Sequence, residues 1–328
     1  MPRASRMSGR DRRVRVRRAI TLAVAIAALC LCAASMADAA HARWHRSFED
    51  ALAAAADSGK PIVVFAYISQ PGGAYDFAHD GMLHETLVDE GVVAALQAFE
   101  PVLFDVRAPG NEAARRRLRV SPVVTTATGV VDVERVASYP ITLFLDRRGD
   151  ELFRRHGYLP PDGYRMQLQR SATLFEKRRA VTDQPDSAVA RRELGRAYME
   201  MDFAPDDAFY QAAVENLERA LALDPNNLTG AKFDARVDLT ILYLPDDPEQ
   251  ALTDLRGLQA EDAEGDRRFE IQYFTAVAQY VLEDMPGAIR TLERFETHDR
   301  ASPWFDSPWT PQALGLLDHI RERVEAGG

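Results

Sequence analysis

The side chains best able to do chemistry in this chain are Cys30 and Cys32, because a thiolate is a nucleophile and two thiols can form a disulfide. Both cysteines lie near the N-terminus, and none follows them. Eight arginines within the first 18 residues precede an uncharged apolar run over residues 19–34 and small residues that end at Ala39. This order is typical of a secretory signal peptide, so we expect residues 1–39 to be removed together with both thiols.

An uncleaved membrane anchor is the alternative, although the apolar run is shorter than the roughly 20 residues that a spanning helix needs. In both cases the arginine cluster stays in the cytoplasm and the chain after it crosses the membrane, which predicts a periplasmic or secreted protein. Removing residues 1–39 leaves 32 Lys and Arg against 48 Asp and Glu, a net charge of −16. We therefore expect no nucleic-acid partner. Nearly all basic residues are arginine, which indicates a GC-rich bacterial genome.

Metal-binding side chains gather before the first long helix, at Asp76, His79, Asp80 and His84. Asp80 and His84 alone among them have the i, i+4 spacing that shares a helix face, and no dense His or Cys pattern accompanies them. We expect a solvated loop there, with no metal and no other cofactor. The sequence has no nucleophile elbow, phosphate-binding loop or zinc-protease motif, so we do not expect an enzyme.

The elements that would position a site in the first half are predicted from apolar patterns. Residues 61–67 and 102–106 are apolar runs rich in β-branched and aromatic side chains, typical of buried strands. A helix predicted over residues 84–99 connects them in a right-handed parallel unit. An earlier helix is predicted to begin after Ser47, which suits an N-cap, and to end at Gly59.

The next segment carries a predicted hairpin and a helix. Strands over residues 139–146 and 151–154 are joined by a short turn, which favours antiparallel pairing, and a helix is predicted over residues 160–178. Before them, a short helix is predicted over residues 111–118. It is followed up to residue 136 by either an inserted hairpin or an irregular loop.

These elements, with five short motifs, resemble the thioredoxin-like superfamily, especially its bacterial members, over residues 45–178. The matching segments are SGKP at 58–61, FDV at 104–106, YPIT at 139–142, DRRGDE at 146–151 and GY at 157–158. No single segment is specific, but their order and spacing are. The resemblance implies an α/β domain in which Pro140 is the cis-proline beside the active site, with Pro122 as the competing candidate.

The resemblance places the family's Cys-x-x-Cys on residues 70–73, where this chain has Gln-Pro-Gly-Gly. An amide and a glycine supply neither a nucleophilic nor a resolving thiol, so we expect no disulfide exchange. What remains is a loop at the C-terminal end of a strand, facing a helix N-terminus, which suits ligand or peptide binding. The candidate binding residues there are Gln70, Gly73, Tyr139 and Pro140.

The second half contains a repeat. An apolar triplet with +4 and +7 spacing occurs three times, 38 and 37 residues apart: Ala213, Leu217 and Ala220; Ala251, Leu255 and Leu258; Ala288, Leu292 and Phe295. This period predicts helical-hairpin repeats. Leu194-Gly195, Tyr198 and Asp224-Pro225 resemble the tetratricopeptide repeat. We expect a thioredoxin-like domain over residues 40–181 and an all-α domain of three degenerate repeats over residues 182–328.

A final helix is predicted to close the stack. Thr310 suits its N-cap and Pro311 its first position, and its apolar residues Leu314, Leu317 and Ile320 would seal the open end. We expect Trp304 and Trp309 to pack against the last repeat.

The first helices of the repeats are predicted over residues 188–201, 233–244 and 269–282 and should line a concave face. Arg192, Arg196 and Tyr273 would then point into a groove. Arginine holds a carboxylate through paired hydrogen bonds, so the groove could accept an acidic or C-terminal segment of another secreted protein. The alternative is that both arginines pair with nearby acids such as Glu193 or Glu200.

Two classes of function follow. The first is an exported, redox-inactive interaction, scaffold or chaperone-like module that binds a protein or peptide partner, secreted or membrane-associated. The second is an enzyme or small-ligand-binding protein that uses other chemistry around Gln70, Tyr139 and Pro140. We do not expect an integral membrane protein unless the signal is retained.

Overall fold

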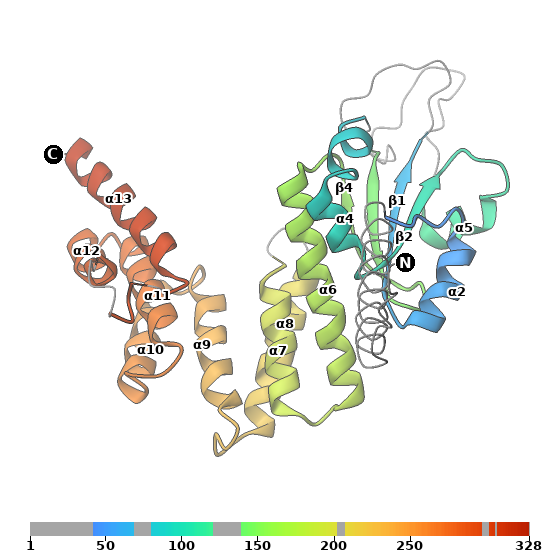
Figure 1. Cartoon of the computed structure of the whole chain (residues 1–328). Helices are drawn as coiled ribbons and strands as arrows, with labels where there is room; N and C mark the ends of the chain where they lie inside the picture. Colours follow the sequence, from blue (N-terminus) through green and yellow to red (C-terminus); the bar gives the residue numbers. More distant parts are fainter. Residues whose placement is uncertain are drawn as a thin grey trace, which may run out of the picture. The chain divides into compact units, whose positions relative to one another are not determined.

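A computed structural model describes residues 42–68, 80–120, 139–201, 207–296, 302–305 and 307–327. The chain divides into two compact units, Met1–Ala172 and Thr173–Gly328. In the described residues the first unit combines a sheet with helices, whereas the second consists of helices (Figure 1). The predicted order of an α/β part followed by an all-α part is confirmed at this level. The predicted signal peptide and the insertion between residues 121 and 136 lie outside the described residues.

The first unit is built on a four-stranded mixed sheet in the order β2-β1-β3-β4. Its strands are β1 (Ile62–Tyr67), β2 (Glu100–Asp105), β3 (Ile141–Leu145) and β4 (Glu151–His156). β1 runs parallel to β2 and antiparallel to β3, and β3 and β4 form an antiparallel hairpin. The predicted parallel unit and the predicted hairpin are therefore confirmed.

The first helix, α2 (Phe48–Ser58), begins and ends where the sequence predicts. Ser47 Oγ accepts a 3.0 Å hydrogen bond from the Asp50 N–H and so satisfies an otherwise unpaired amide of the first turn. Gly59 ends the helix with φ at 74°, a left-handed conformation that glycine adopts readily. Helix α5 (Glu112–Leu118) also matches its predicted bounds closely.

The prediction of one continuous helix over residues 84–99 is wrong. The structure has a π-helical turn, η1 (Met82–Thr86), and a separate helix α4 (Glu90–Leu96). Asp89 Oδ1 accepts a 3.0 Å hydrogen bond from the Val92 N–H, so Asp89 is the N-cap of a new helix. Buried apolar residues continue on both sides of the break, and for this reason the apolar pattern concealed it.

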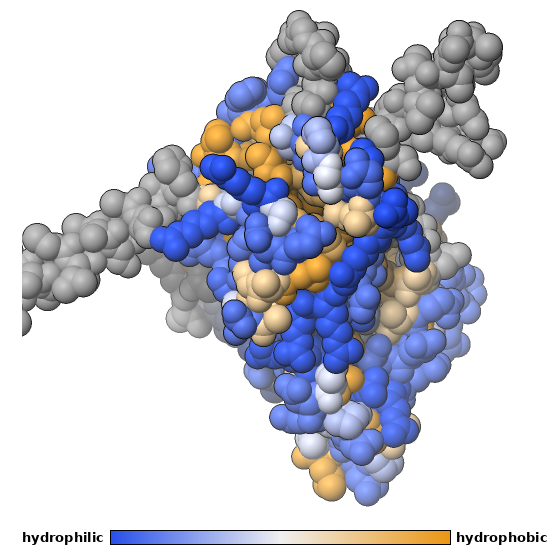
Figure 2. Space-filling model, turned by 90° about the vertical axis from the view of Figure 1, so that its right-hand side faces the viewer, coloured by the Kyte–Doolittle hydropathy of each residue, from blue (hydrophilic) through white to orange (hydrophobic). Residues whose placement is uncertain are grey.

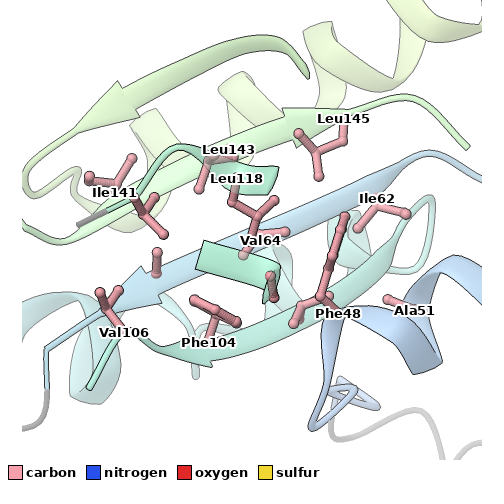
Figure 3. Packing of buried hydrophobic residues seen from close by; sticks show 14 of the residues in the cluster. Phe48, Ala51, Ile62, Val64, Phe104, Val106, Leu118, Ile141, Leu143 and Leu145 are labelled. Atoms are coloured by element: carbon pink, nitrogen blue, oxygen red, sulfur yellow. The ribbon is translucent and has the colours of Figure 1, made fainter. Parts of the chain in front are cut away.

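One face of the sheet packs on an apolar core that α2 and α5 cover (Figure 3). Alternate residues of each strand enter it because strand side chains point to the two faces in turn. Val64 of β1 and Leu143 of β3 are opposite each other in register and both are fully buried. Phe48 and Leu118 pack over them from the two helices. The described part of this unit buries no charged side chain.

The second unit consists of consecutive helices that pack on their neighbours. They are α7 (Ala188–Met199), α8 (Asp207–Leu223), α9 (Ala231–Tyr243), α10 (Pro248–Glu261), α11 (Arg268–Val281), α12 (Met285–Leu292), the 3-10 turn η3 (Glu293–Phe295) and α13 (Thr310–Gly327). All nine residues of the predicted triplets are at most 3% exposed. The predicted helical pairs and their buried faces are therefore confirmed.

Helix α6 (Pro161–Asp183) crosses the division between the two units. Its first half buries Tyr164 in the first unit. In its second half, Arg178 Nη1 donates a 2.9 Å hydrogen bond to the hydroxyl of Tyr198 on α7. The helix continues past its predicted end, so the boundary predicted after residue 181 falls inside it rather than in a linker.

The last helix closes the second unit as predicted. Leu317 and Ile320 of α13 are fully buried and Leu314 is partly buried. Trp304 contacts the rings of Phe269 and Phe295, with centroids 4.7 and 5.0 Å apart. The predicted packing of the tryptophan against the last repeat is confirmed.

The surface of the protein and its helices can be compared with what a membrane-spanning chain needs. Hydrophilic residues dominate the face shown in Figure 2, where hydrophobic residues form smaller areas. Of the helices that the structure describes, none combines the length and the apolar character needed to cross a membrane.

Candidate functional site

The first candidate region is the end of the sheet where β1 and β2 finish and β3 begins. The strand register pairs Tyr67 with Asp105 and places Ile141 beside the end of β1. Tyr139 and Pro140 directly precede β3 and therefore lie at the same end. The Tyr139–Pro140 peptide bond is cis, as predicted.

The structure does not place every predicted residue of this region. Five of them lie outside the described residues: Gln70, Gly73, Asp76, His79 and Pro122. Asp80 and His84 are described. Across the described ranges, no group of three or more His, Cys, Asp and Glu side chains is arranged to hold a metal ion.

Hydrogen bonds fix the main chain where β2 ends. The Asp105 carboxylate accepts a 2.9 Å hydrogen bond from the Arg107 N–H, and Asn111 donates one of 2.8 Å to the Asp105 carbonyl. Burial, and then the charge of Asp105, raise the pKa of Tyr67. The Tyr67 phenol is therefore neutral at pH 7.

A tyrosine that the sequence analysis did not propose as a site residue joins the same end. The Gly157 N–H donates a 2.8 Å hydrogen bond to the Pro140 carbonyl, which brings Tyr158 close to Pro140. The Tyr158 hydroxyl donates to Glu85 on η1 at 3.2 Å. No motif of catalytic or binding residues contains Tyr158, but its place in the GY segment at 157–158 could have identified it. This end of the sheet therefore carries three tyrosines, and no cysteine follows Cys32 in the sequence.

The second candidate region is an ion-pair network on the first helices of the repeats. Arg192 and Arg196 lie one turn apart on α7, and both contact the fully buried Asp238 of α9 at 2.8 Å. Arg267, the N-cap of α11, reaches the same carboxylate at 2.6 Å. One buried aspartate thus binds three guanidinium groups.

A second carboxylate completes the network. Glu270 of α11 is 5% exposed. Its Oε2 accepts a 2.6 Å hydrogen bond from Arg267 Nε. Its Oε1 lies 2.7 Å from Arg196 Nη2, in an orientation that makes this contact an ion pair and not a hydrogen bond. The network therefore joins α7, α9 and α11.

More exposed acids surround this buried centre at longer distances. Asp234 lies 3.7 Å from Arg192 and 3.3 Å from Arg267, and Glu200 lies 3.4 Å from Arg196. Their side chains are 34% and 50% exposed, against 14–25% for the arginines. The carboxylates, rather than the guanidinium groups, are thus the more accessible charges on this face.

The pKa values of the arginines reflect these contacts. Burial by itself lowers the pKa of Arg196, but the charges of Asp238 and Glu270 outweigh it and raise the pKa overall. Burial also lowers the pKa of Arg267, and the charges of Asp238 and Glu270 again outweigh it and raise the pKa overall. Both guanidinium groups are therefore charged at pH 7.

The structure favours the internal-pairing alternative for Arg192 and Arg196, although mainly with other acids than those predicted. Glu193 binds Lys177 at 3.0 Å, whereas Asp238 and Glu270 were not predicted as partners. Each of these two acids lies between apolar neighbours on a first helix, and a charge at such an inward position is the signal that could have identified them. Because both arginines are bound within the chain, an acidic partner segment would have to displace a carboxylate.

Tyr273, the third predicted groove residue, also has partners. Its ring stacks on Trp309 with centroids 5.2 Å apart and meets the edge of Phe274 at 5.1 Å. Burial raises its pKa. Tyr273 therefore belongs to an aromatic cluster at the end of the stack and is separate from the ion-pair network.

Comparison with models of known protein families gives no match, and comparison with curated proteins gives none either. A function for this chain must therefore be argued from its residues and their geometry.

Proposed function

We propose that this protein is an exported, redox-inactive interaction module. In this proposal a thioredoxin-like unit without its cysteines precedes a stack of tetratricopeptide-like hairpins, and the stack binds a protein or peptide partner in the periplasm or outside the cell. The observation that carries the proposal is the series of helix pairs with buried triplets, whose first helices α7, α9 and α11 share one ionic network. Stacked hairpins of this kind present an extended surface for a partner.

The composition supports a binding role for the first unit as well. No cysteine follows Cys32, so the mature chain has no thiol for redox chemistry. The sheet end instead presents Tyr67, Tyr139 and Tyr158, and tyrosine combines apolar contact area with a hydrogen-bonding group.

The face of α11 that carries Glu270 offers a surface for the partner of the stack. Phe274, Val277 and Val281 follow Glu270 at +4, +7 and +11, which places all four on one side of the helix. Phe274 and Val277 are partly buried against the core, while Val281 is 49% exposed. The accessible carboxylates beside this apolar strip argue against the acidic partner that the two arginines suggested.

The test is capture of a defined partner from periplasmic extract by the immobilised chain from residue 40 onward. Val281→Asp should weaken that capture about tenfold, which is about 1.4 kcal/mol, because it places a charge in the apolar strip. Val324→Asp on α13 is the matched control, since Val324 is equally exposed at 48% but lies outside the first helices.

The two variants separate the outcomes. Weaker capture by Val281→Asp, with Val324→Asp unchanged, supports the proposed face. If Val281→Asp captures the partner as well as Val324→Asp does, this face is excluded. A bound small molecule in place of a protein favours the alternative of a ligand-binding protein or enzyme.

A further inference from the structure

The start of the described chain runs along the outer edge of the sheet. β2 is an end strand of the sheet, and His45 forms a parallel bridge with Val102 beside it. The His45 N–H donates a 2.8 Å hydrogen bond to the Pro101 carbonyl, and the Leu103 N–H donates one of 3.3 Å to the His45 carbonyl. Residue 45 therefore covers two polar main-chain groups of an edge strand that would otherwise be open.

The side chain of the same residue is also held. His45 Nε2 lies 2.8 Å from Glu100 Oε2, and Ser58 Oγ donates a 2.7 Å hydrogen bond to Glu100 Oε1. The side chains of His45 and Glu100 are 23% and 14% exposed, so water reaches the pair only in part. Main-chain and side-chain contacts from β2 thus converge on His45, and Ser58 at the end of α2 holds the Glu100 carboxylate.

Charge determines how strong this contact is. Burial by itself raises the pKa of Glu100, but hydrogen bonds from His45 and Ser58 and the charge of Lys60 outweigh it and lower the pKa. Lys60 lies just before β1, and the segment of His45 itself carries Arg43 and Arg46. Glu100 is therefore ionised from mildly acidic pH upward. Histidine changes its charge between about pH 5 and 8, and a bond between two charged groups is roughly twice as strong as a neutral one.

We propose that His45 and Glu100 form a pH-dependent latch, which holds residues 44–46 on the edge of β2 while His45 is protonated and loosens when it becomes neutral. The latch is strongest where imidazole is protonated and weakens as pH rises through the range in which histidine changes its charge. It also fails at strongly acidic pH, where Glu100 takes up a proton. Loosening exposes the Pro101 carbonyl and the Leu103 N–H to water or to another strand. This latch is independent of the function proposed above.

The test is amide hydrogen exchange of the exported chain between about pH 5.5 and pH 8, expressed as protection relative to an unstructured amide at the same pH. Protection of the His45 and Leu103 amides should fall about fivefold or more over this range, while the Val64 amide in the core of β1 should stay constant. In His45→Gln, which keeps a hydrogen-bonding group but cannot titrate, protection of both amides should not change with pH.

His319→Gln is the matched control, because this histidine contacts Tyr280 in the second unit and its loss should leave the fall intact. A fall of equal size in His45→Gln, or no fall in the parent chain, would overturn the latch. A parallel fall at Val64 would also overturn it, because it would show that the whole unit becomes less stable. Glu100→Gln provides a second variant and should show low protection of both amides at every pH.

Discussion

The two units of this chain bury different kinds of side chain. In its described residues the first unit buries no charged group, and the face of its sheet that α2 and α5 cover packs on an apolar cluster. The second unit buries Asp238 and Glu270, at 0% and 5% exposure, and holds them with three arginines. A sheet fixes its strands through main-chain hydrogen bonds, whereas packed helices have no such bonds between them. The ionic network supplies directional contacts between α7, α9 and α11 that the sheet does not need.

The two interiors also contribute differently to the stability of their units. Apolar burial stabilises the first unit in rough proportion to the area removed from water. A buried ion pair adds little net stability, because desolvation offsets most of the attraction, but losing one partner is costly. We therefore expect the network to determine how the three first helices align more than how stable the unit is.

The largest expected effect comes from Asp238→Asn, which removes the charge that three arginines share. It should lower the free energy of unfolding of the second unit by about 3–5 kcal/mol, because the guanidinium groups lose their central buried partner. Urea denaturation followed by circular dichroism measures this loss.

Glu264→Gln, at an exposed acid in the same unit, is the control and should have little effect. A loss below about 1 kcal/mol in Asp238→Asn would show that the charge of Asp238 contributes little to stability, and the contrast between the two interiors would disappear. Arg192→Ala with Arg196→Ala should also destabilise this unit, so that double variant is a poor probe of binding.

The next effect tests the apolar interior. Leu143→Ala should destabilise the first unit by about 2–5 kcal/mol, because it removes a fully buried side chain and leaves a cavity opposite Val64. Leu228→Ala, at a position 86% exposed, is the comparison and should change stability little. Similar losses in both would mean that the β1–β3 core is loosely packed.

A smaller effect concerns close helix packing. A Cβ at Gly195 on α7 would lie 2.6 Å from Leu217 Cγ and 3.1 Å from the Ala213 carbonyl oxygen on α8. Gly195→Ala should therefore cost about 1–3 kcal/mol through overpacking. Gly257→Ala on α10, where no atom lies within 4 Å, should instead stabilise by about 0.5–1 kcal/mol. Thermal melting of the two variants should shift in opposite directions, and shifts of the same sign would contradict this contact.

The smallest expected effect concerns the N-cap of helix α2. Ser47→Ala removes the side-chain cap of α2 and should cost about 1 kcal/mol in urea denaturation. Ser47→Asp keeps an acceptor and adds a charge that suits a helix N-terminus, so it should retain the parent stability. A loss in Ser47→Asp equal to that in Ser47→Ala would show that the cap bond contributes nothing.

The sequence predicts the sheet because each strand is an apolar run with turn residues at both ends. It predicts the helical pairs because the apolar triplets repeat at a nearly fixed period. It misplaces the break at Asp89, since burial on both sides of that residue keeps the period of one helix. It does not predict that Arg192 pairs with Asp238, because the two residues are 46 positions apart. No local sequence pattern indicates which charged residues of different helices form ion pairs. The end of α6 is misplaced because the helix continues through Thr182 and Asp183, residue types that also occur in turns.

The continuous helix α6 has a consequence for how this protein could have evolved. Domains usually join at exposed linkers, so that recombination can exchange one domain and leave the other intact. Here residues 161–172 belong to the first unit and residues 173–183 to the second, within one helix. A crossover in this helix would leave each unit with only half of the helix inherited from its own parent. Descendants of this gene should therefore inherit the sheet and the helical stack as a pair, and shuffling should be confined to the ends of the chain.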